Sequence, residues 1–156
     1  MDRTKKRKKL ESIDKLLILM VIVTVLIVTF NSTFRIECVD GSSMEDTLHN
    51  EDIILVNYRV SADDLSDRDI VILDTAYMKN YKQHSPSIIK RYYADLSTTG
   101  LYVLGDNAEI SYDSRYFGEA EKEALRGKMV INFGDYPVVN KILKFILLPE
   151  SRQKAY

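Results

Sequence analysis

Hydrophobic and polar positions divide the chain into one long apolar run followed by a series of short ones. Residues 16–30 are apolar except for two threonines and carry no charge. As a helix this run would span about 22 Å, and extension to Phe34 would bring it to about 28 Å, near the ~30 Å of a bilayer hydrocarbon core. The pattern therefore predicts a membrane-spanning helix over residues 16–34.

A cleaved signal peptide would show a similar basic start and apolar core, but it would end in a cleavage site of small residues. The segment Asn31-Ser32-Thr33-Phe34 has no Ala-x-Ala pattern, so we interpret the helix as an uncleaved, single-pass anchor in the cell membrane. Residues 1–15 hold seven of the 22 basic residues and three of the 23 acidic ones. The positive-inside rule then predicts that residues 1–15 are cytoplasmic and that residues 35–156 lie on the outer side.

The pattern changes after the apolar run to short segments rich in Val, Ile and Tyr, separated by Gly, Asp, Asn and Ser. Such segments predict strands, here at residues 34–39, 52–58, 69–74, 87–93, 101–104 and 128–133. Short helical turns are expected at residues 61–68 and 119–126. The fold class is therefore mostly β, a small sandwich or partial barrel. Residues 138–148 are apolar but contain two lysines, so we expect a core or interfacial segment and not a second span.

Charge and composition narrow the function classes. Beyond residue 15 the chain has 15 basic and 20 acidic residues, which argues against a nucleic-acid-binding domain. Cys38 is the only cysteine, so an intrachain disulfide is excluded, and we expect a small buried side chain. The only histidines, His49 and His84, are isolated and are expected on the surface, so no metal or organic cofactor is implied.

Two stretches contain a candidate nucleophile and base. Ser43 lies in a glycine-led turn just beyond the apolar run, but its hydroxyl needs a neighbouring base to become a nucleophile. Lys90 follows two isoleucines in a predicted strand, and burial there would lower the pKa of its amine. Arg91 would lower it further if its guanidinium came close. A lysine that is neutral near pH 7 can deprotonate a serine directly, whereas a lysine pointing to solvent would have no such role.

A third stretch, residues 105–118, is dense in small polar groups directly after a predicted strand. It could be an ordinary turn or a calcium-type loop, but the spacing of an EF-hand is absent. Asp113 and Arg115 could instead form a charge-assisted pair that fixes the loop.

Together, the three stretches resemble type I signal peptidases, membrane-anchored Ser-Lys proteases that remove signal peptides from exported proteins. The family pattern around the nucleophile, Gly/Ser-x-Ser-Met-x-Pro-Thr-Leu, is similar to Gly41-Ser42-Ser43-Met44-Glu45-Asp46-Thr47-Leu48. The family's Lys-Arg matches Lys90-Arg91. Its late motif matches Gly105-Asp106-Asn107, Ser111, Asp113-Ser114-Arg115 and Gly118, and Gly127-Lys128 resembles the opening of the family's last core strand.

The resemblance implies roles for these residues. Ser43 would be the nucleophile and Lys90 the general base, while Ser111 would hold the lysine amine by a hydrogen bond. Asp113 and Arg115 would support the site. The backbone N–H of Ser43, within the turn Gly41-Ser42-Ser43, would form the oxyanion hole. Signal peptides of exported preproteins would be the substrates, with the lipid bilayer and the secretion translocon as expected partners.

Three departures from the family pattern stand out. Gly41 occupies the position from which some members supply a second oxyanion donor, and Asp46 replaces the motif proline. The chain after Arg91 also lacks the family's usual long insertion. These departures keep an alternative open, a non-proteolytic accessory or chaperone protein of surface or pilus assembly on the same fold. A cytoplasmic repressor-type Ser-Lys autoprotease would also use Gly-x-Ser-Met, but it would need a DNA-binding headpiece and no membrane span.

Overall fold

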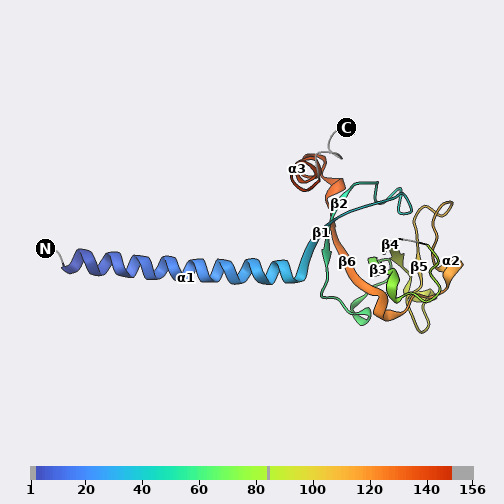
Figure 1. Ribbon diagram of the computed structural model, residues 1–156, viewed down its shortest axis with the longest axis horizontal. Helices are drawn as coiled ribbons and strands as arrows, with labels where there is room; N and C mark the ends of the chain where they lie inside the picture. The colour runs from blue at the N-terminus through green and yellow to red at the C-terminus, as the bar shows by residue number, and fades with distance from the viewer. Residues whose placement is uncertain (1–2, 84, 149–156) are drawn as a thin grey trace. The chain divides into compact units, whose positions relative to one another are not determined.

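The protein divides into a long helix and a compact β domain, with the division after Thr33. The structure is a computed structural model and describes residues 3–83 and 85–148. Helix α1 runs from Arg3 to Thr33, and its segment Ile13–Thr33 is long and apolar enough to cross a membrane (Figure 1). The expected span at residues 16–34 thus lies within a longer helix, except for Phe34, which is the first residue of strand β1.

The β domain is built on one six-stranded antiparallel sheet in the order β1-β2-β6-β3-β4-β5 (Figure 1). Its strands are β1 (Phe34–Cys38), β2 (Ile53–Asn57), β3 (Ile70–Asp74), β4 (Ser87–Tyr92), β5 (Val103–Leu104) and β6 (Leu125–Asn132). The mostly-β prediction is confirmed. The strands form a single sheet that is not closed, since β1 and β5 remain at its two edges.

Strand β6 determines the curvature of the sheet because it pairs with two different strands. Its first half lies beside β3, its second half beside β2, and the register shifts once in each pairing. Such shifts bend a strand and increase its twist. The curved sheet carries two clusters of buried apolar side chains. One is centred on Val71, Leu73, Leu101, Val103 and Phe117. The other contains Val39, Met44, Leu48, Ile54, Val56, Ile70 and Ile72.

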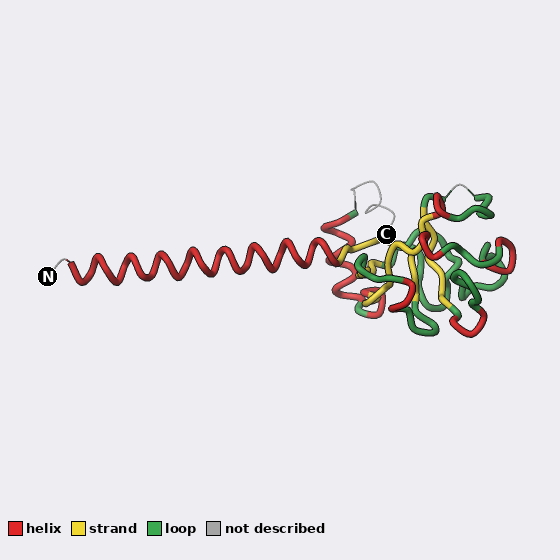
Figure 2. Tube along the Cα trace, turned by 90° about the horizontal axis from the view of Figure 1, so that it is seen from below, coloured by secondary structure: helices red, strands yellow, loops and turns green. Residues whose placement is uncertain are grey.

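The helices of the β domain are short, and most are single turns in the connections (Figure 2). The 3₁₀ turns are Ala62–Asp64, Thr75–Tyr77, Ala94–Leu96, Lys122–Ala124 and Phe133–Asp135. Helix α2 spans Ser114–Phe117, and helix α3 spans Pro137–Leu147.

The six predicted strands all occur, with ends that differ by a few residues. The largest difference is β6, which begins at Leu125 and not at residue 128. The helical turn expected over residues 119–126 is correspondingly limited to Lys122–Ala124. Residues 34–39 were located by alternation, and the other strands as short runs rich in Val, Ile and Tyr between turn residues. Strand β3 is buried on both faces, with Val71 and Leu73 in one cluster and Ile70 and Ile72 in the other.

Candidate active site

Ser43 lies in the connection between β1 and β2, in a turn that packs on the core of the β domain. The side chains of Met44 and Leu48 are buried and pack on Ile54 and Val56 of β2. The carbonyl oxygen of Met44 accepts hydrogen bonds from the backbone N–H groups of Thr47 and Leu48, at 3.0 and 2.8 Å. The nucleophile candidate is therefore fixed by its own neighbours in the sequence.

Two residues of this turn have backbone conformations in the left-handed region. Gly41 has φ +100° and Asp46 has φ 79°. Glycine adopts such a conformation freely and aspartate tolerates it. Proline cannot, because its ring fixes φ near −65°. The turn after Ser43 therefore has a shape that the family's usual proline at position 46 would not permit.

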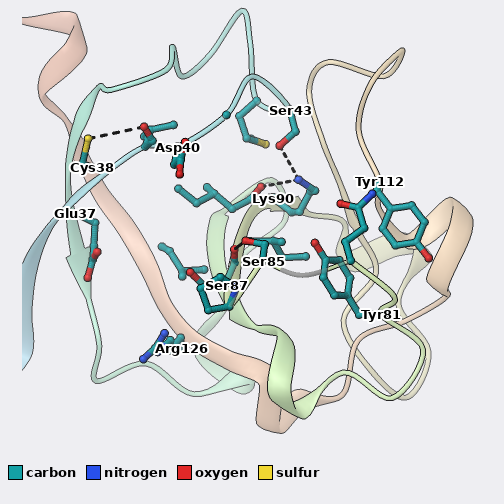
Figure 3. Close-up of a pocket in the computed structure, with 18 of the residues that line it drawn as sticks. Glu37, Cys38, Asp40, Ser43, Tyr81, Ser85, Ser87, Lys90, Tyr112 and Arg126 are labelled. Carbon is teal, nitrogen blue, oxygen red and sulfur yellow. Dashed lines mark hydrogen bonds between the residues drawn. The ribbon is translucent and has the colours of Figure 1, made fainter. Parts of the chain in front are cut away.

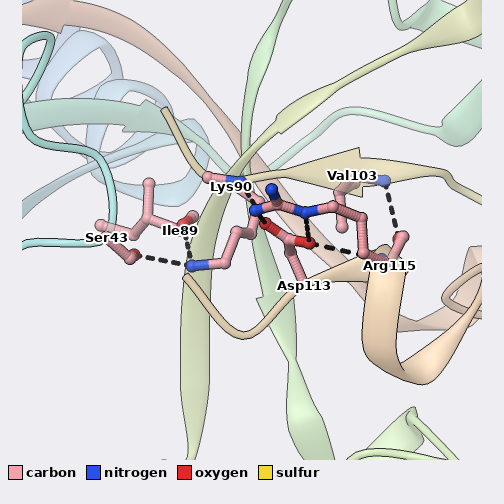
Figure 4. Close-up of polar contacts among 8 residues, drawn as sticks. Ser43, Ile89, Lys90, Val103, Asp113 and Arg115 are labelled. Atoms are coloured by element: carbon pink, nitrogen blue, oxygen red, sulfur yellow. Dashed lines mark hydrogen bonds and ion pairs between the residues drawn. The ribbon is translucent and has the colours of Figure 1, made fainter. Parts of the chain in front are cut away.

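Lys90 brings its amine to this turn from the centre of β4. Its side chain is 3% exposed, and Nζ lies 2.7 Å from Ser43 Oγ and 3.0 Å from the carbonyl oxygen of Ile89 (Figure 4). Burial lowers the pKa of Lys90 from 10.5 to about 8, although the carboxylates of Asp113 and Asp106 act in the opposite direction. A large fraction of the amine is therefore neutral slightly above physiological pH, as a general base requires.

Arg91 points to the opposite side of the strand, as the period of two in a β-strand requires. Its Nε and NH2 bind the two carboxylate oxygens of Asp106 at 2.8 and 2.6 Å. NH2 also contacts Thr47 Oγ1, at 3.1 Å. The guanidinium thus joins β4 to the loop after β5 and to the Ser43 turn. It is not among the groups that lower the Lys90 pKa, which is a correction to the expectation from sequence.

Asp113 is the fully buried centre of the loop that follows β5. One of its oxygens accepts hydrogen bonds from Arg115 NH2 and from the backbone N–H of Gly105, at 2.6 and 2.9 Å. The other accepts from Arg115 Nε at 2.8 Å, so the ion pair is bidentate (Figure 4). These donors lower the pKa of Asp113 despite its burial. The charge-assisted pair proposed from the sequence is present in the structure.

Ser111 lies beside this carboxylate, and its hydroxyl is buried without a hydrogen-bond partner among the described residues. Its proximity contributes to the lowered pKa of Asp113, although the two groups do not reach hydrogen-bond geometry. The hydrogen bond expected between Ser111 and the Lys90 amine is likewise not formed. Gly105 packs so closely between the two serines that a Cβ there would overlap Ser111 Oγ and the carbonyl oxygen of Ser43.

A cavity of about 510 Å³ opens on the Ser43–Lys90 pair. Figure 3 shows both side chains at its edge. One wall is formed by residues 35, 37–41, 43 and 44, from β1 to the Ser43 turn, and another by residues 81, 83 and 85–90, which include the first four residues of β4. Tyr81 and Tyr112 contact each other edge to face, with 5.6 Å between their ring centroids, and line the same cavity. An extended peptide would fit a groove with two such walls.

The remaining candidates lie around this site or away from it. The backbone N–H of Gly41 is bound to Asn50 Oδ1 at 2.9 Å, and the carbonyl oxygen of Ser42 accepts from the N–H of Glu45 at 3.1 Å. Cys38 is half-buried and lines the cavity, which corrects its prediction as a buried side chain. His49 is largely exposed beside Asp52, as expected. The prediction for His84 falls outside the described residues.

The chain matches a family of known proteins. The family described as signal peptidase, peptidase S26, matches residues 10–95 and 73–133, which together cover most of the chain. The chain belongs to the signal peptidase S26 family. A search of curated proteins found no match. The resemblance derived from the sequence is thereby confirmed at the level of the family, and the matched region includes all three stretches that carry the candidate site.

Sequence reasoning missed part of the support for the S26 site. Asp106 was matched to the family's late motif and weighed as a calcium ligand, but it was not expected to be the carboxylate that Arg91 binds. Thr47, which also contacts Arg91, was not singled out. The orientation of Arg91 could have been predicted from the sequence. Successive side chains of a strand point to opposite faces, so Arg91 must point away from the face to which Lys90 turns. A guanidinium in that position is expected to bind a carboxylate through two hydrogen bonds. Ser114, whose Oγ accepts from the backbone N–H of Val103 at 2.9 Å, had no such signal.

Proposed function

We propose that the protein is a membrane-anchored serine endopeptidase that removes signal peptides from exported proteins through a Ser43–Lys90 dyad. The observation that carries the proposal is the 2.7 Å contact between Ser43 Oγ and the buried Nζ of Lys90. This distance lies within the range over which a base can take a proton from a nucleophile. A serine and a lysine on a surface would seldom be brought together and enclosed in this way.

The reaction begins when neutral Lys90 takes the proton of Ser43 Oγ and the oxygen attacks the carbonyl carbon after the signal peptide. Collapse of the tetrahedral intermediate breaks the C–N bond, and the Lys90 ammonium gives its proton to the leaving amine. This leaves the signal peptide as an ester on Ser43. Lys90, neutral again, then takes a proton from water, and the resulting attack releases the acid and regenerates Ser43.

Stabilisation of the oxyanion would come from the backbone N–H of Ser43. Gly41 has no side chain that could supply a second donor, and loss of one such donor can cost about 3 kcal/mol of transition-state stabilisation. The Asp113–Arg115 pair would act through the backbone, because Asp113 also binds the N–H of Gly105, next to Ser111 and the Ser43 carbonyl. Ser111, whose hydroxyl is buried and unpaired among the described residues, would act on the site through its packing against Gly105, next to the Ser43 carbonyl.

The substrate would bind as an extended strand between the two walls of the cavity. Strand β1 is at an edge of the sheet, and an exposed edge can pair with an added strand. The wall near the dyad contains the apolar residues Val39, Met44 and Ile88. The resemblance to type I signal peptidases implies small residues at positions −1 and −3 of the signal peptide, and these three apolar side chains would line the pockets that accept them.

The anchor would keep the β domain beside the membrane at which preproteins emerge. Helix α1 would cross the bilayer with residues 1–15 in the cytoplasm and residues 35–156 on the outer side, because the basic residues cluster before the span. Tethering the enzyme and its substrate to the same surface raises their effective concentration.

Cleavage of a preprotein in detergent by the full chain and matched variants tests the proposal. Ser43→Ala and Lys90→Met should each lower kcat by about 10³-fold or more, as removal of a nucleophile or its base does in other serine proteases. Two controls, Ser42→Ala and Lys128→Met, alter the same residue types beside the nucleophile and in β6, and should stay within a few-fold of wild type. Equal cleavage by all five proteins would refute the dyad, and no cleavage by the wild type would favour the accessory-protein alternative.

A further inference from the structure

Helix α3 differs from an ordinary surface helix, because the residue that it buries is polar and most of its apolar residues are exposed. Its one buried residue is Asn140, which is polar. Most of its apolar residues are exposed instead: Val138 is 74% exposed, Ile146 67% and Ile142 54%, while Leu143 is half-buried. A surface helix of a globular domain normally turns its apolar stripe to the core. In α3 that stripe faces outward.

Polar contacts fix the helix in this orientation. Asn140 Oδ1 accepts a hydrogen bond from the backbone N–H of Ile53 at 3.2 Å, and its Nδ2 donates to Asp52 Oδ1 at 3.1 Å. The other oxygen of Asp52 accepts from the backbone N–H of His49 at 2.9 Å. Asp52 also packs against Gly134, where a Cβ would overlap the carboxylate. The inner face of α3 is therefore a defined polar joint to the start of β2, and rotation of the apolar stripe inward would break it.

The outward stripe is continuous along the helix. At about 3.6 residues per turn, Val138, Ile142 and Ile146 follow one another on a single face, roughly opposite Asn140. Lys141 lies at the border of this face, and the helix contains no acidic residue. A short helix with an apolar face, a lysine at the border of that face and a polar inner joint has the composition of an interfacial membrane helix.

We propose that α3 lies in the interface of an anionic lipid bilayer, with its apolar stripe inserted and the Lys141 ammonium among the headgroups. Lipid suits this surface better than a second protein because the stripe is flanked by positive charge on a domain that is otherwise acidic.

The sheet carries a second exposed apolar row near the same joint. Ile36 of β1 and Ile131 of β6 both pair with Leu55 of β2, so the three side chains share one face. Ile36 is 43% and Ile131 37% exposed. Strands β1 and β6 both pair with β2, and α3 is hydrogen-bonded to the start of β2. Exposed apolar side chains of the sheet and of α3 are therefore found at the same end of the domain. A membrane contact would cover such groups.

Site-specific fluorescence quenching in vesicles tests this contact in the full chain. With Cys38 replaced by Ser, a single cysteine is introduced by Ile142→Cys and labelled with an environment-sensitive fluorophore. The matched control carries the label through Asp63→Cys, on an exposed turn that precedes β3. In phosphatidylcholine vesicles containing phosphatidylglycerol, we expect quenchers attached to lipid acyl chains to quench the label at 142 several-fold more than that at 63, and aqueous iodide to show the reverse order.

Three results would overturn the proposal. Equal iodide quenching at both positions would place the helix in water. Shielding of the label at 142 that increases with the protein-to-lipid ratio would indicate a second copy of the chain. Shielding that persists in very dilute protein without lipid or detergent would indicate that the chain itself covers the label. The variant Lys141→Glu, which keeps the stripe and reverses the charge, should lower lipid quenching at 142 in anionic vesicles but not in pure phosphatidylcholine. Because none of these readouts involves cleavage, their outcome is independent of the proposed peptidase activity.

Discussion

The amine of Lys90 is the least expected charge in the β domain, because it is enclosed and has no carboxylate bound to it directly. Asp113 is held by Arg115 and Asp106 by Arg91, so both nearby carboxylates are already paired. Their fields raise the Lys90 pKa, but desolvation is the larger effect and lowers it to about 8. The pairing of these carboxylates with arginines thus leaves the lysine without a direct ion-pair partner, which the proposed role as a base requires.

Replacement of Lys90 by Met should stabilise the protein at neutral pH. The folded-state pKa of about 8 lies below the unfolded value of 10.5, so between these pH values the unfolded chain binds more protons and stability rises with pH. Below pH 8 the protonated, buried amine destabilises the fold by about 3 kcal/mol. After loss of two hydrogen bonds of about 1 kcal/mol each, Lys90→Met should unfold at higher urea concentration at pH 7.

The comparison with Lys128→Met makes this prediction specific. Lys128 is partly exposed and binds Asp69 at 2.9 Å, so its replacement should leave stability unchanged or slightly lower. Two results would contradict the inferred cost of burying the protonated amine. One is a Lys90→Met variant that is clearly less stable than wild type at pH 7, and the other is a wild type that shows no rise in stability between pH 8 and 10.5.

The backbone at Asp46 predicts a second effect at the residue scale. Asp46→Pro, which restores the residue of the family motif, should lower the melting temperature and the cleavage rate because proline cannot adopt φ 79°. Asp46→Gly should be neutral or stabilise by up to about 1 kcal/mol, since glycine relieves the left-handed strain. Differential scanning fluorimetry of the two variants decides the point: a proline variant as stable as the glycine one would show that the turn has another shape.

At the scale of elements, the turn after β5 and the turn after β1 depend on each other. The N–H of Asn107 donates to the carbonyl oxygen of Ser43 at 3.1 Å, and Gly105 fills the narrow space between Ser43 and Ser111. Two segments that are far apart in the sequence thus meet without room for one methyl group. The geometry of the dyad is therefore set by how β5 and its loop pack on the Ser43 turn.

Gly105→Ala should separate these turns, with a loss of about 1–3 kcal/mol of stability and a larger loss of kcat. Gly118→Ala provides the control, because Gly118 has φ +80° but open space around its Cα. It should cost about 1 kcal/mol through backbone strain alone and leave the activity per folded molecule intact. Equal kcat values for the two variants, measured under conditions in which both are folded, would contradict the close coupling of the turns.

The elements themselves were largely predictable from sequence, while the contacts between them were not. The strands are short apolar runs between turn residues, so their composition and the turn signals located them, and only residues 34–39 were located by alternation. The period of two of a strand explains why Lys90 faces inward and Arg91 outward. By contrast, the partner of Arg91 and the unpaired hydroxyl of Ser111 depend on the loop after β5, which no periodicity describes. The exposure of the apolar stripe of α3 could not be predicted either, because the sequence does not tell whether the apolar face of a helix is buried or exposed.

At the scale of the whole molecule, the helix and the β domain are separate units. The strands and both apolar clusters lie beyond Thr33, so the fold of the domain contains its own core. The S26 match begins at residue 10 and thus includes part of α1. Membrane attachment is therefore expected to affect where the enzyme acts more than how the dyad is built.

A chain comprising residues 34–156 should fold and cleave a short signal-peptide substrate in solution with a kcat close to that of the full chain. Against a preprotein embedded in vesicles it should be slower by an order of magnitude or more, because it loses the shared surface. Parallel assays on the two substrates measure this difference. Equal loss on both substrates would mean that α1 is needed for the fold of the site and not only for its location.

The dependence of kcat/KM on pH, measured with a substrate that has no titrating group near the cleavage site, tests the central claim most directly. This ratio reports the ionisation of the free enzyme. If Lys90 is the base, kcat/KM rises with pH to a plateau, with a midpoint near pH 8, where Lys90 loses its proton. A profile that stays flat from acid to alkaline pH, or that falls through this range, would contradict Lys90 as the base that activates Ser43.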